Sequence, residues 1–170
     1  MRLKLGSRRM ALILGSLVIK VPRSDFFMNH CQGLLQRLWH GQWRGASRLF
    51  GFALRYHWSA IRQNWTEFQA WWELRAKFLA PTYFSCGILN LQRYVEGESP
   101  TLEDLAALWK GLSDSAQRDF RSVNSHCLWE PANIAQTPNG YCLVDYGDKT
   151  GALRRFLIRN RQEIEEHLRR

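Results

Sequence analysis

The apolar positions of this chain change their spacing several times along its length, and each change predicts a different element. Residues 10–21 are β-prone and interrupted by Gly15 and Ser16, which predicts two strands that turn at these residues. After them, apolar residues recur at helical intervals. Three helices are expected there, over residues 25–39, 46–60 or beyond, and 64–78, and Gly41 and Gly45 mark a break between the first two.

The second half of the chain alternates short strands and helices. Residues 82–84 and 86–96 are predicted strands. Residues 99–104 have the composition of a helix start, and the helix continues through Leu112, after which residues 115–123 extend it or form a second short helix. A hairpin with a turn at residues 137–140 follows, and its strands carry residues 134–135 and 141–144. Residues 153–168 form an amphipathic helix.

Length and charge limit the classes of protein to consider. The 170 residues suffice for one domain with a real core. The net charge of +9 and the pI of about 9.9 favour an anionic partner, which can be a nucleotide, a nucleic acid or an acidic membrane surface. The four cysteines show no C-x-x-C spacing, which argues against zinc ligation and redox chemistry. We therefore expect buried thiols in a reducing, cytoplasmic compartment.

The N-terminal segment has two interpretations. Basic residues precede the apolar residues 10–19, as they do in a secretory signal peptide. The apolar run is short, however, and Lys20 follows it directly in place of a cleavage motif. We favour the strand hairpin over the signal peptide. No other stretch approaches the length of a membrane span.

Residues 25–58 form an unusual stretch in which tryptophans and other apolar residues alternate with arginines. Such a stretch can stack on single-stranded nucleic acid, can lie on an anionic membrane, or can be a core helix with a charged outer face. We favour the core helix, then the membrane, because tryptophan and arginine both suit an interface.

A candidate metal site lies in residues 126–147. Asn133 precedes the first strand of the predicted hairpin, and Asp145 follows the second. Both oxygen ligands are therefore expected at the same end of one hairpin. Mg²⁺ prefers oxygen ligands and often completes its shell with substrate phosphates, so this pair predicts a magnesium site.

This stretch resembles the catalytic core of the protein-kinase-like superfamily, which carries H-x-D-x-x-x-x-N, a hairpin and then D-x-G. His126, Asn133, Asp145 and Gly147 match that pattern. Leu128 stands where the family has its catalytic Asp. The residues that hold the metal are present, and the residue that orients the acceptor hydroxyl is missing.

The resemblance extends to the N-terminal half. Lys20 on the second predicted strand matches the lysine that holds nucleotide phosphates, and a helix glutamate should pair with it. We prefer Glu67 to Glu73 for that role. The chain has no G-x-G-x-x-G loop. The arginines of residues 5–9 are candidates to replace part of its phosphate contact.

The resemblance implies an α+β fold, a reduced two-lobed kinase-like fold that binds ATP and Mg²⁺. Residues 1–170 would form a single domain, with a small antiparallel sheet in residues 1–97 and a truncated, mainly helical lobe in residues 98–170. Residues 25–60 would be an insertion. The order of the motifs is similar to that of small bacterial kinase-like proteins, namely lipopolysaccharide-core sugar kinases and PhoP-regulatory-network (YrbL-type) proteins.

Three functions follow. The first is phosphate transfer to an anionic small molecule or a sugar of the lipopolysaccharide type, with Glu130, Asp148 or His126 substituting for the missing Asp. The second is a pseudokinase that regulates a partner without turnover. The third is a basic protein that binds nucleic acid or a membrane surface. Under the first two, a cytoplasmic location at the inner face of the membrane would suit the basic aromatic stretch.

Overall fold

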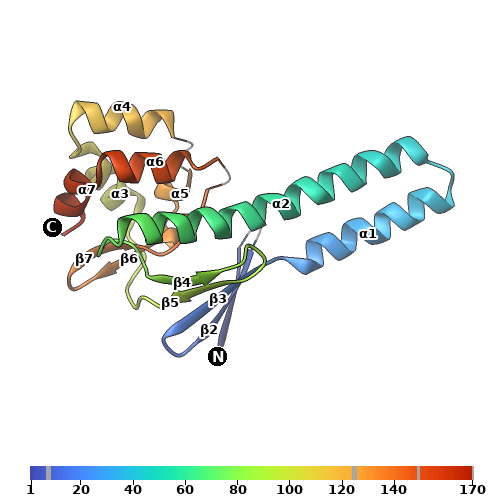
Figure 1. Ribbon diagram of the computed structural model, residues 1–170, viewed down its shortest axis with the longest axis horizontal. Helices are drawn as coiled ribbons and strands as arrows, with labels where there is room; N and C mark the ends of the chain where they lie inside the picture. Colours follow the sequence, from blue (N-terminus) through green and yellow to red (C-terminus); the bar gives the residue numbers. More distant parts are fainter. Residues whose placement is uncertain (7–8, 124–125, 149, 170) are drawn as a thin grey trace.

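The computed structural model describes residues 1–6, 9–123, 126–148 and 150–169, with the side chains of residues 24–27, 122 and 126–127 left aside. The fold is α+β, with a five-stranded antiparallel sheet, a separate two-stranded hairpin and several helices (Figure 1). No helix in the described part of the chain combines the length and the apolar character needed to cross a membrane.

The five-stranded sheet has the order β1-β2-β3-β5-β4, and all neighbouring strands are antiparallel. Its strands are β1 (Arg2–Leu5), β2 (Arg9–Leu14), β3 (Leu17–Pro22), β4 (Thr82–Ser85) and β5 (Asn90–Arg93). The predicted hairpin of residues 10–21 is confirmed, since β2 and β3 turn where Gly15 has a φ of 57°, a conformation that glycine adopts without strain. β1 was not predicted.

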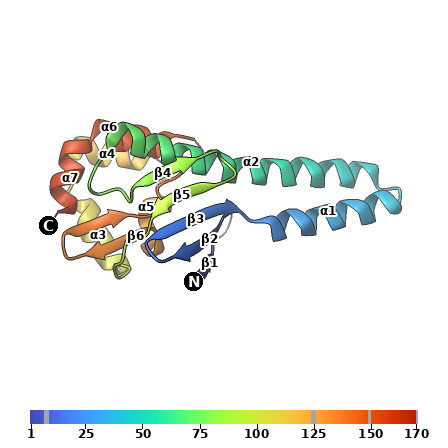
Figure 2. The same ribbon diagram turned by 60° about the horizontal axis from the view of Figure 1, so that its bottom comes forward.

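Two antiparallel helices, α1 (Ser24–Trp39) and α2 (Trp43–Leu74), follow β3 and project from the body of the molecule (Figures 1 and 2). The predicted break is confirmed at Gly41, which has a φ of 68°, but not at Gly45, which lies inside α2. The prediction of separate helices at residues 46–60 and 64–78 was wrong. Residues 61–63 contain no helix breaker, so one 32-residue helix runs from the tip of the projection into the body.

Two predicted ends also differ from the structure. α2 ends at Leu74 and not at residue 78, because Arg75 takes a left-handed conformation that closes the helix. The strand predicted over residues 86–96 is only β5, because Cys86 N–H donates to the carbonyl of Leu89 and residues 86–89 form a turn.

The C-terminal half contains the remaining helices and the second hairpin. These elements are α3 (Leu102–Lys110), α4 (Asp114–Ser122), α5 (His126–Trp129), the 3₁₀ turn η1 (Pro131–Asn133), β6 (Ile134–Thr137), β7 (Gly140–Leu143), α6 (Ala152–Arg159) and α7 (Arg161–Leu168). The helix start predicted within residues 99–104 is confirmed, and the structure shows that Thr101 and Asp104 form a capping box there. The single helix predicted over residues 153–168 is two helices that meet at Asn160.

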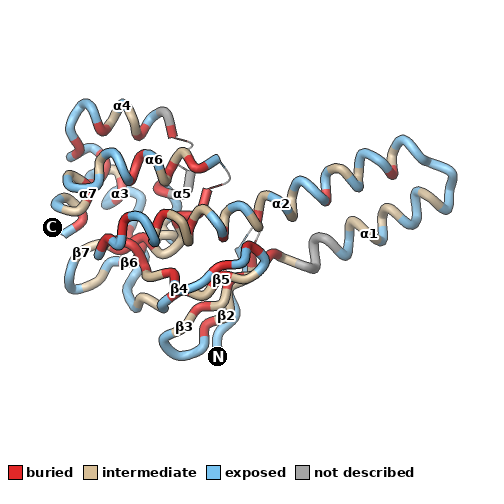
Figure 3. Tube along the Cα trace, viewed as in Figure 1, coloured by how far each residue is buried: buried red, intermediate tan, exposed pale blue. Residues whose placement is uncertain are grey.

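The main hydrophobic core joins the second half of α2 to the C-terminal helices and the β6–β7 hairpin. It contains Ala70 and Leu74 of α2, and its other members lie between Ala76 and Leu168. Figure 3 shows the contrast, because buried residues are concentrated in the body and are sparse in the projecting part of α1 and α2. The body therefore has the packing of a folded core, and α2 connects it to the projection.

Candidate functional site

A cavity of about 670 Å³ lies between the five-stranded sheet and the C-terminal half. β1, β2, β3 and residues 92–99 line one part of it, and residues 130–135, 144–148 and 150 line another. Both basic and acidic side chains reach it: Lys4, Arg9, Lys20, Arg93, Glu130, Asp145 and Asp148. Segments that are distant in sequence thus meet around one space, which is the usual form of a ligand site.

Lys20 and Glu67 form an ion pair at this cavity. Lys20 Nζ lies 2.6 Å from Glu67 Oε1 and also donates to the carbonyl of Val144, at 2.8 Å. Both side chains are buried. Glu67 points inward because it belongs to the buried side of α2, together with Asn64 and Ala70. The ion pair joins β3 to α2 across 47 positions of the sequence.

Glu73, the other glutamate considered for this role, lies elsewhere. Its carboxylate pairs with Arg154 of α6, where Arg154 Nε lies 2.9 Å from Glu73 Oε2. This pair is on the surface, and such pairs contribute about 0–1 kcal/mol. Glu67 is therefore the glutamate that the fold brings to Lys20.

Arg9 is the second cation of the site. Its Nη1 donates to Glu67 Oε2 and to Asn64 Oδ1, at 2.9 Å in each case, and its Nη2 pairs with Asp145. Burial alone would lower the pKa of Arg9, but the carboxylates of Asp145 and Glu67 outweigh it and hold the pKa above its ordinary value. In the sequence, Arg9 was only one of the basic residues in 5–9 that we considered for phosphate contact. No pattern in the sequence indicated its inward side chain, because the predicted strand began at residue 10 and the structure begins β2 at Arg9.

Two amides complete the surroundings of Glu67, and no pattern in the sequence indicated them. Asn90 Nδ2 lies 2.9 Å from Glu67 Oε2, and Gln92 Nε2 lies 3.3 Å from Glu67 Oε1. Both amides come from β5. A fully buried carboxylate is costly unless it is paired and hydrogen-bonded. With two cations and two amides as donors, both oxygens of Glu67 are satisfied.

Asp145 and Asn133 line the same cavity, as the predicted magnesium site requires. The backbone carbonyl of Asn133 accepts the N–H groups of Val144 and Asp145, at 2.8 and 3.2 Å, and this fixes the two segments relative to each other. The side chain of Asp145 keeps 35 % of its surface exposed. Burial would raise the pKa of Asp145, but Arg9 and Lys20 lower it below its ordinary value, so the carboxylate is ionised at neutral pH.

One carboxylate and one amide do not hold a metal ion by themselves. Within the described ranges, no cluster of three or more His, Cys, Asp or Glu side chains is suited to a metal. The donors do fit a hard cation whose remaining ligands are phosphate oxygens and water, because both are oxygen donors at one cavity. Such an ion would enter together with a phosphate-bearing ligand.

The segment that carries Asp145 is fastened to α2. Thr66 Oγ1 donates to the carbonyl of Asp148, at 2.6 Å. A Cβ on Gly147 would overlap the backbone of Gln63, so only glycine allows this approach. The phenol of Tyr146 is buried against Thr82 and Ala80, at 2.9 and 2.8 Å, and burial raises its pKa well above the ordinary value. Asp145 is therefore held in place from both sides.

The three residues considered as substitutes for a catalytic Asp differ in their surroundings. Glu130 is exposed and lines the cavity. Asp148 is buried, and its Oδ2 accepts from Thr150 Oγ1 at 2.5 Å and from the Ala152 N–H at 3.0 Å, so it caps α6. Its Oδ1 has no hydrogen-bond partner in the described structure. The side chain of His126 lies outside the described residues.

Leu128, which stands where the kinase-like pattern has its catalytic Asp, has a structural role in this protein. Its side chain is 1 % exposed and belongs to the hydrophobic core, and its carbonyl accepts the indole N–H of Trp109 at 2.9 Å. An aspartate at this place would be buried among apolar side chains, at a high cost. Leu128 therefore contributes to the hydrophobic core.

The arrangement as a whole suits a ligand with an apolar ring and an anionic group. Apolar side chains of the sheet and of the β6–β7 hairpin line part of the cavity: Ala11, Ile13, Val18, Ile134 and Ala135. Lys20 and Arg9 provide two fixed cations in the same wall. Fixed, partly desolvated cations bind phosphate more strongly than exposed ones do.

No protein-family model matches this sequence, and a search among curated proteins finds no relative of it.

Proposed function

We propose that this protein is kinase-like and binds ATP with Mg²⁺ in the 670 Å³ cavity. The observation that carries the proposal is the buried Lys20–Glu67 pair in the wall of a cavity that Asn133 and Asp145 also line. The sheet with α2 would correspond to the N-terminal lobe of a reduced kinase-like fold. The β6–β7 hairpin and the C-terminal helices would correspond to a truncated C-terminal lobe.

The chemistry of the lining suggests how ATP would lie. The base would occupy the apolar region between Val18 of β3 and Ile134 of β6, next to the backbone of residues 92–97. The phosphates would then extend toward Lys20 and Arg9. The volume lies within the range of about 300–1,000 Å³ that ligand pockets of this size have.

Arg9 gives the site a charge balance in the absence of ligand. Arg9 and Lys20 carry two positive charges, and Glu67 and Asp145 carry two negative charges. When Mg²⁺-ATP binds, Mg²⁺ would replace the guanidinium at Asp145, and Arg9 would turn to the phosphates. This exchange keeps each charge paired, and it gives Arg9 part of the role of the absent glycine-rich loop.

Phosphate transfer to the hydroxyl of a small molecule or sugar is the second candidate function. Glu130 is the residue that favours it, because it is an exposed carboxylate at the same cavity. It would orient the acceptor hydroxyl and accept its proton. Asp148 would serve this role less well, since one of its oxygens caps α6. If Glu130 does not act in this way, the protein is a nucleotide-binding pseudokinase.

Thermal unfolding with and without Mg²⁺-ATP tests the main proposal. A ligand that binds only the folded state raises the melting temperature, and at 100 times its Kd it adds about 2.7 kcal/mol of stability. We expect this rise in the natural protein and in Asp114→Asn, which makes the same chemical change at an exposed site on α4. Asp145→Asn should lose the Mg²⁺-dependent part.

Three results would contradict the proposal: no rise in the natural protein, an equal rise in Asp145→Asn, or a rise that ignores Mg²⁺. Calorimetric titration with ATP on each folded variant separates a lost site from lost stability. Turnover is tested with Glu130→Gln on a panel of sugar acceptors. A loss of about 10²–10⁴-fold is expected for the removal of a proton-accepting group.

A further inference from the structure

The outer face of α2 carries a continuous stripe of exposed apolar side chains, which we call the aromatic stripe. Its members are separated by seven, four, four, seven and seven residues and are between 45 % and 70 % exposed: Trp43, Phe50, Leu54, Trp58, Trp65 and Trp72. These intervals place all six on one side of a helix. A large exposed apolar patch on a protein usually marks an interaction site.

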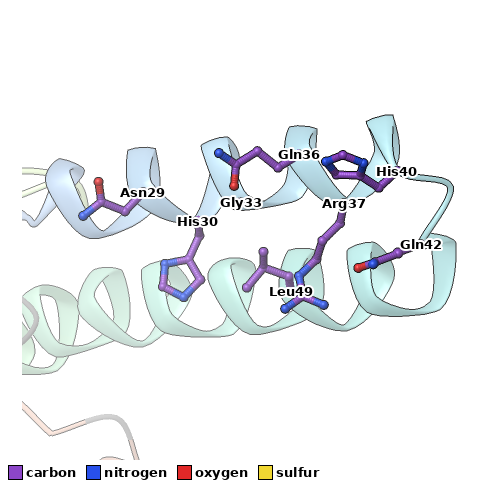
Figure 4. A pocket seen from close by; sticks show the side chains of 8 residues that line it. All are labelled: Asn29, His30, Gly33, Gln36, Arg37, His40, Gln42 and Leu49. Atoms are coloured by element: carbon purple, nitrogen blue, oxygen red, sulfur yellow. The ribbon is translucent and has the colours of Figure 1, made fainter.

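α1 does not cover the aromatic stripe. It packs against another side of α2, where Ala46 and Ala53 are buried, and Gly33 of α1 approaches Leu49 closely. A second cavity, of about 430 Å³, opens between the two helices near their tip. Figure 4 shows that its lining is largely polar, with His30, Gln36 and Arg37 among the side chains. The projection is thus closed by small residues inside and keeps its large apolar residues outside.

A second stripe follows the first, and all its members are cationic. Arg44, Arg48, Arg55 and Arg62 are exposed and are separated by four, seven and seven residues. With 3.6 residues per turn, the four arginines share one side of α2, which adjoins the side that carries the aromatic stripe. Residues 26–66 contain no Asp or Glu at all. The charged side chains of residues 26–66 are therefore all basic, which favours an anionic partner.

Further exposed apolar side chains lie at the edge of the sheet, in and after β4. Ile61 of α2 lies against Gly87 in the turn after β4, and Asn64 Nδ2 donates to the Gly87 carbonyl at 2.6 Å. Close to this contact, Tyr83, Phe84 and Ile88 are exposed by 47–59 %. β4 is an edge strand of the sheet. Exposed apolar side chains thus occur on the body of the molecule as well as on the projection.

We propose that the aromatic stripe and the adjoining arginines dock this protein on an anionic lipid bilayer, with α2 lying in the plane of the interface. Tryptophan rings favour the headgroup region, and arginines beside them pair with lipid phosphates. A helix with an apolar side and a strongly basic side next to it lies on a membrane and does not span it. This surface is independent of the nucleotide cavity, so the inference goes beyond the proposed function.

Single-stranded nucleic acid fits this surface less well. Bases stack on flat aromatic faces beside the cations that bind the phosphates. Leu54, a member of the aromatic stripe, and Ile61, which lies between Trp58 and Trp65 in the sequence, are aliphatic and offer no such face. A bilayer, in contrast, accepts aliphatic and aromatic groups equally.

Flotation of the full chain with lipid vesicles tests the inference. We expect binding to vesicles of phosphatidylcholine mixed with phosphatidylglycerol and little binding to phosphatidylcholine alone. Arg48→Glu/Arg55→Glu should weaken binding by at least about tenfold, since each basic residue near an anionic surface contributes measurably. Arg118→Glu/Arg121→Glu reverses the same charge on exposed positions of α4 and is the matched control, which should bind nearly as the natural protein does.

Trp43→Ala/Trp58→Ala tests the apolar part of the surface with the charge unchanged. It should weaken vesicle binding and make the remainder more sensitive to salt, since only the electrostatic part is left. Circular dichroism checks that each variant keeps its helix content. The inference would be overturned by equal binding to both kinds of vesicle, by equal losses in the α4 control, or by tighter binding to a single-stranded oligonucleotide. A concentration-dependent dimer that Trp43→Ala/Trp58→Ala abolishes would also overturn it.

Discussion

Arg9 pairs with Asp145 although the two residues are 136 positions apart in the sequence. The same guanidinium also holds Glu67 and Asn64 of α2. Arg9 therefore links three parts of the fold, namely the sheet, α2 and the segment after β7. Its charge takes the position beside Asp145 where the proposed site needs a cation.

Replacement of Arg9 should strongly destabilise the protein. Arg9→Ala leaves Asp145 without its closest cation and Glu67 with Lys20 alone, and the breaking of a buried pair from one side costs about 3 kcal/mol or more. Urea unfolding measures this loss. Arg2→Ala, an equivalent change at an exposed position of β1, should stay within about 0.5 kcal/mol of the natural protein. A cost below about 1 kcal/mol for Arg9→Ala would mean that the network does little for stability.

Asp145 should make stability fall in acid. Its folded pKa is lowered from 3.8, so the stability from its pairs is complete above that value and is lost as the pH falls through the lower folded pKa. Asp145→Asn should be less stable at neutral pH and should show a flatter dependence between about pH 5 and pH 2. Chemical denaturation at several pH values measures both effects. Parallel curves for the two proteins would argue against the ion pair.

Two glycines offer a paired test of close approach. Gly147→Ala should cost about 2 kcal/mol, because the added methyl group would overlap the backbone of Gln63. Gly51→Ala in α2 meets nothing within 4 Å, and alanine should stabilise the helix there by about 0.5–1 kcal/mol. Opposite signs are thus expected from the same chemical change. Melting temperatures of the two variants are the measurement, and a neutral Gly147→Ala would show that the segment moves away easily.

The thiols should differ in their reactivity. Burial raises the pKa of Cys142 to about 12, whereas Cys86 is exposed in the turn after β4. The thiolate is the reactive form, so Cys86 should react with a maleimide at neutral pH long before Cys142 does. Mass spectrometry of digests after timed labelling follows both sites, and urea should remove the difference. Early labelling of Cys142 in the native protein would mean that β7 opens readily.

Short-range patterns predicted much of the fold. The β2–β3 turn, the break at Gly41, the start of α3 and the β6–β7 turn each depend on glycine, proline or a capping side chain close by. The predicted gap after residue 60 was wrong because residues 61–63 contain no helix breaker and the helix continues through them. β1 has polar and apolar residues on an exposed edge and gave no clear signal.

Part of the site was predicted as well, because several of its residues belong to a motif with a fixed order along the sequence. Lys20, Glu67, Asn133 and Asp145 came from an ordered motif, and the fold brings them to one cavity or, for Glu67, to a residue that lines it. Asn90 and Gln92 could not be predicted, because their role depends on the pairing of β3 with β5. The magnesium ion, ATP and the phosphate acceptor stay predictions. The sequence shows that Leu128 departs from the motif, and the structure shows that its side chain is packed in the core.

Because α2 is one continuous helix, it relates the orientation of the projection to the orientation of the site. The helix turns by about 100° at each residue, so the direction of Glu67 and the direction of Trp58 are related by a fixed rotation. A single residue inserted between them would rotate the projection by that angle and turn the arginines away from their present side. An insertion of seven residues would nearly restore the phase and move the tip outward by about 10 Å. The length of this helix can therefore change only in steps that keep its two ends in register.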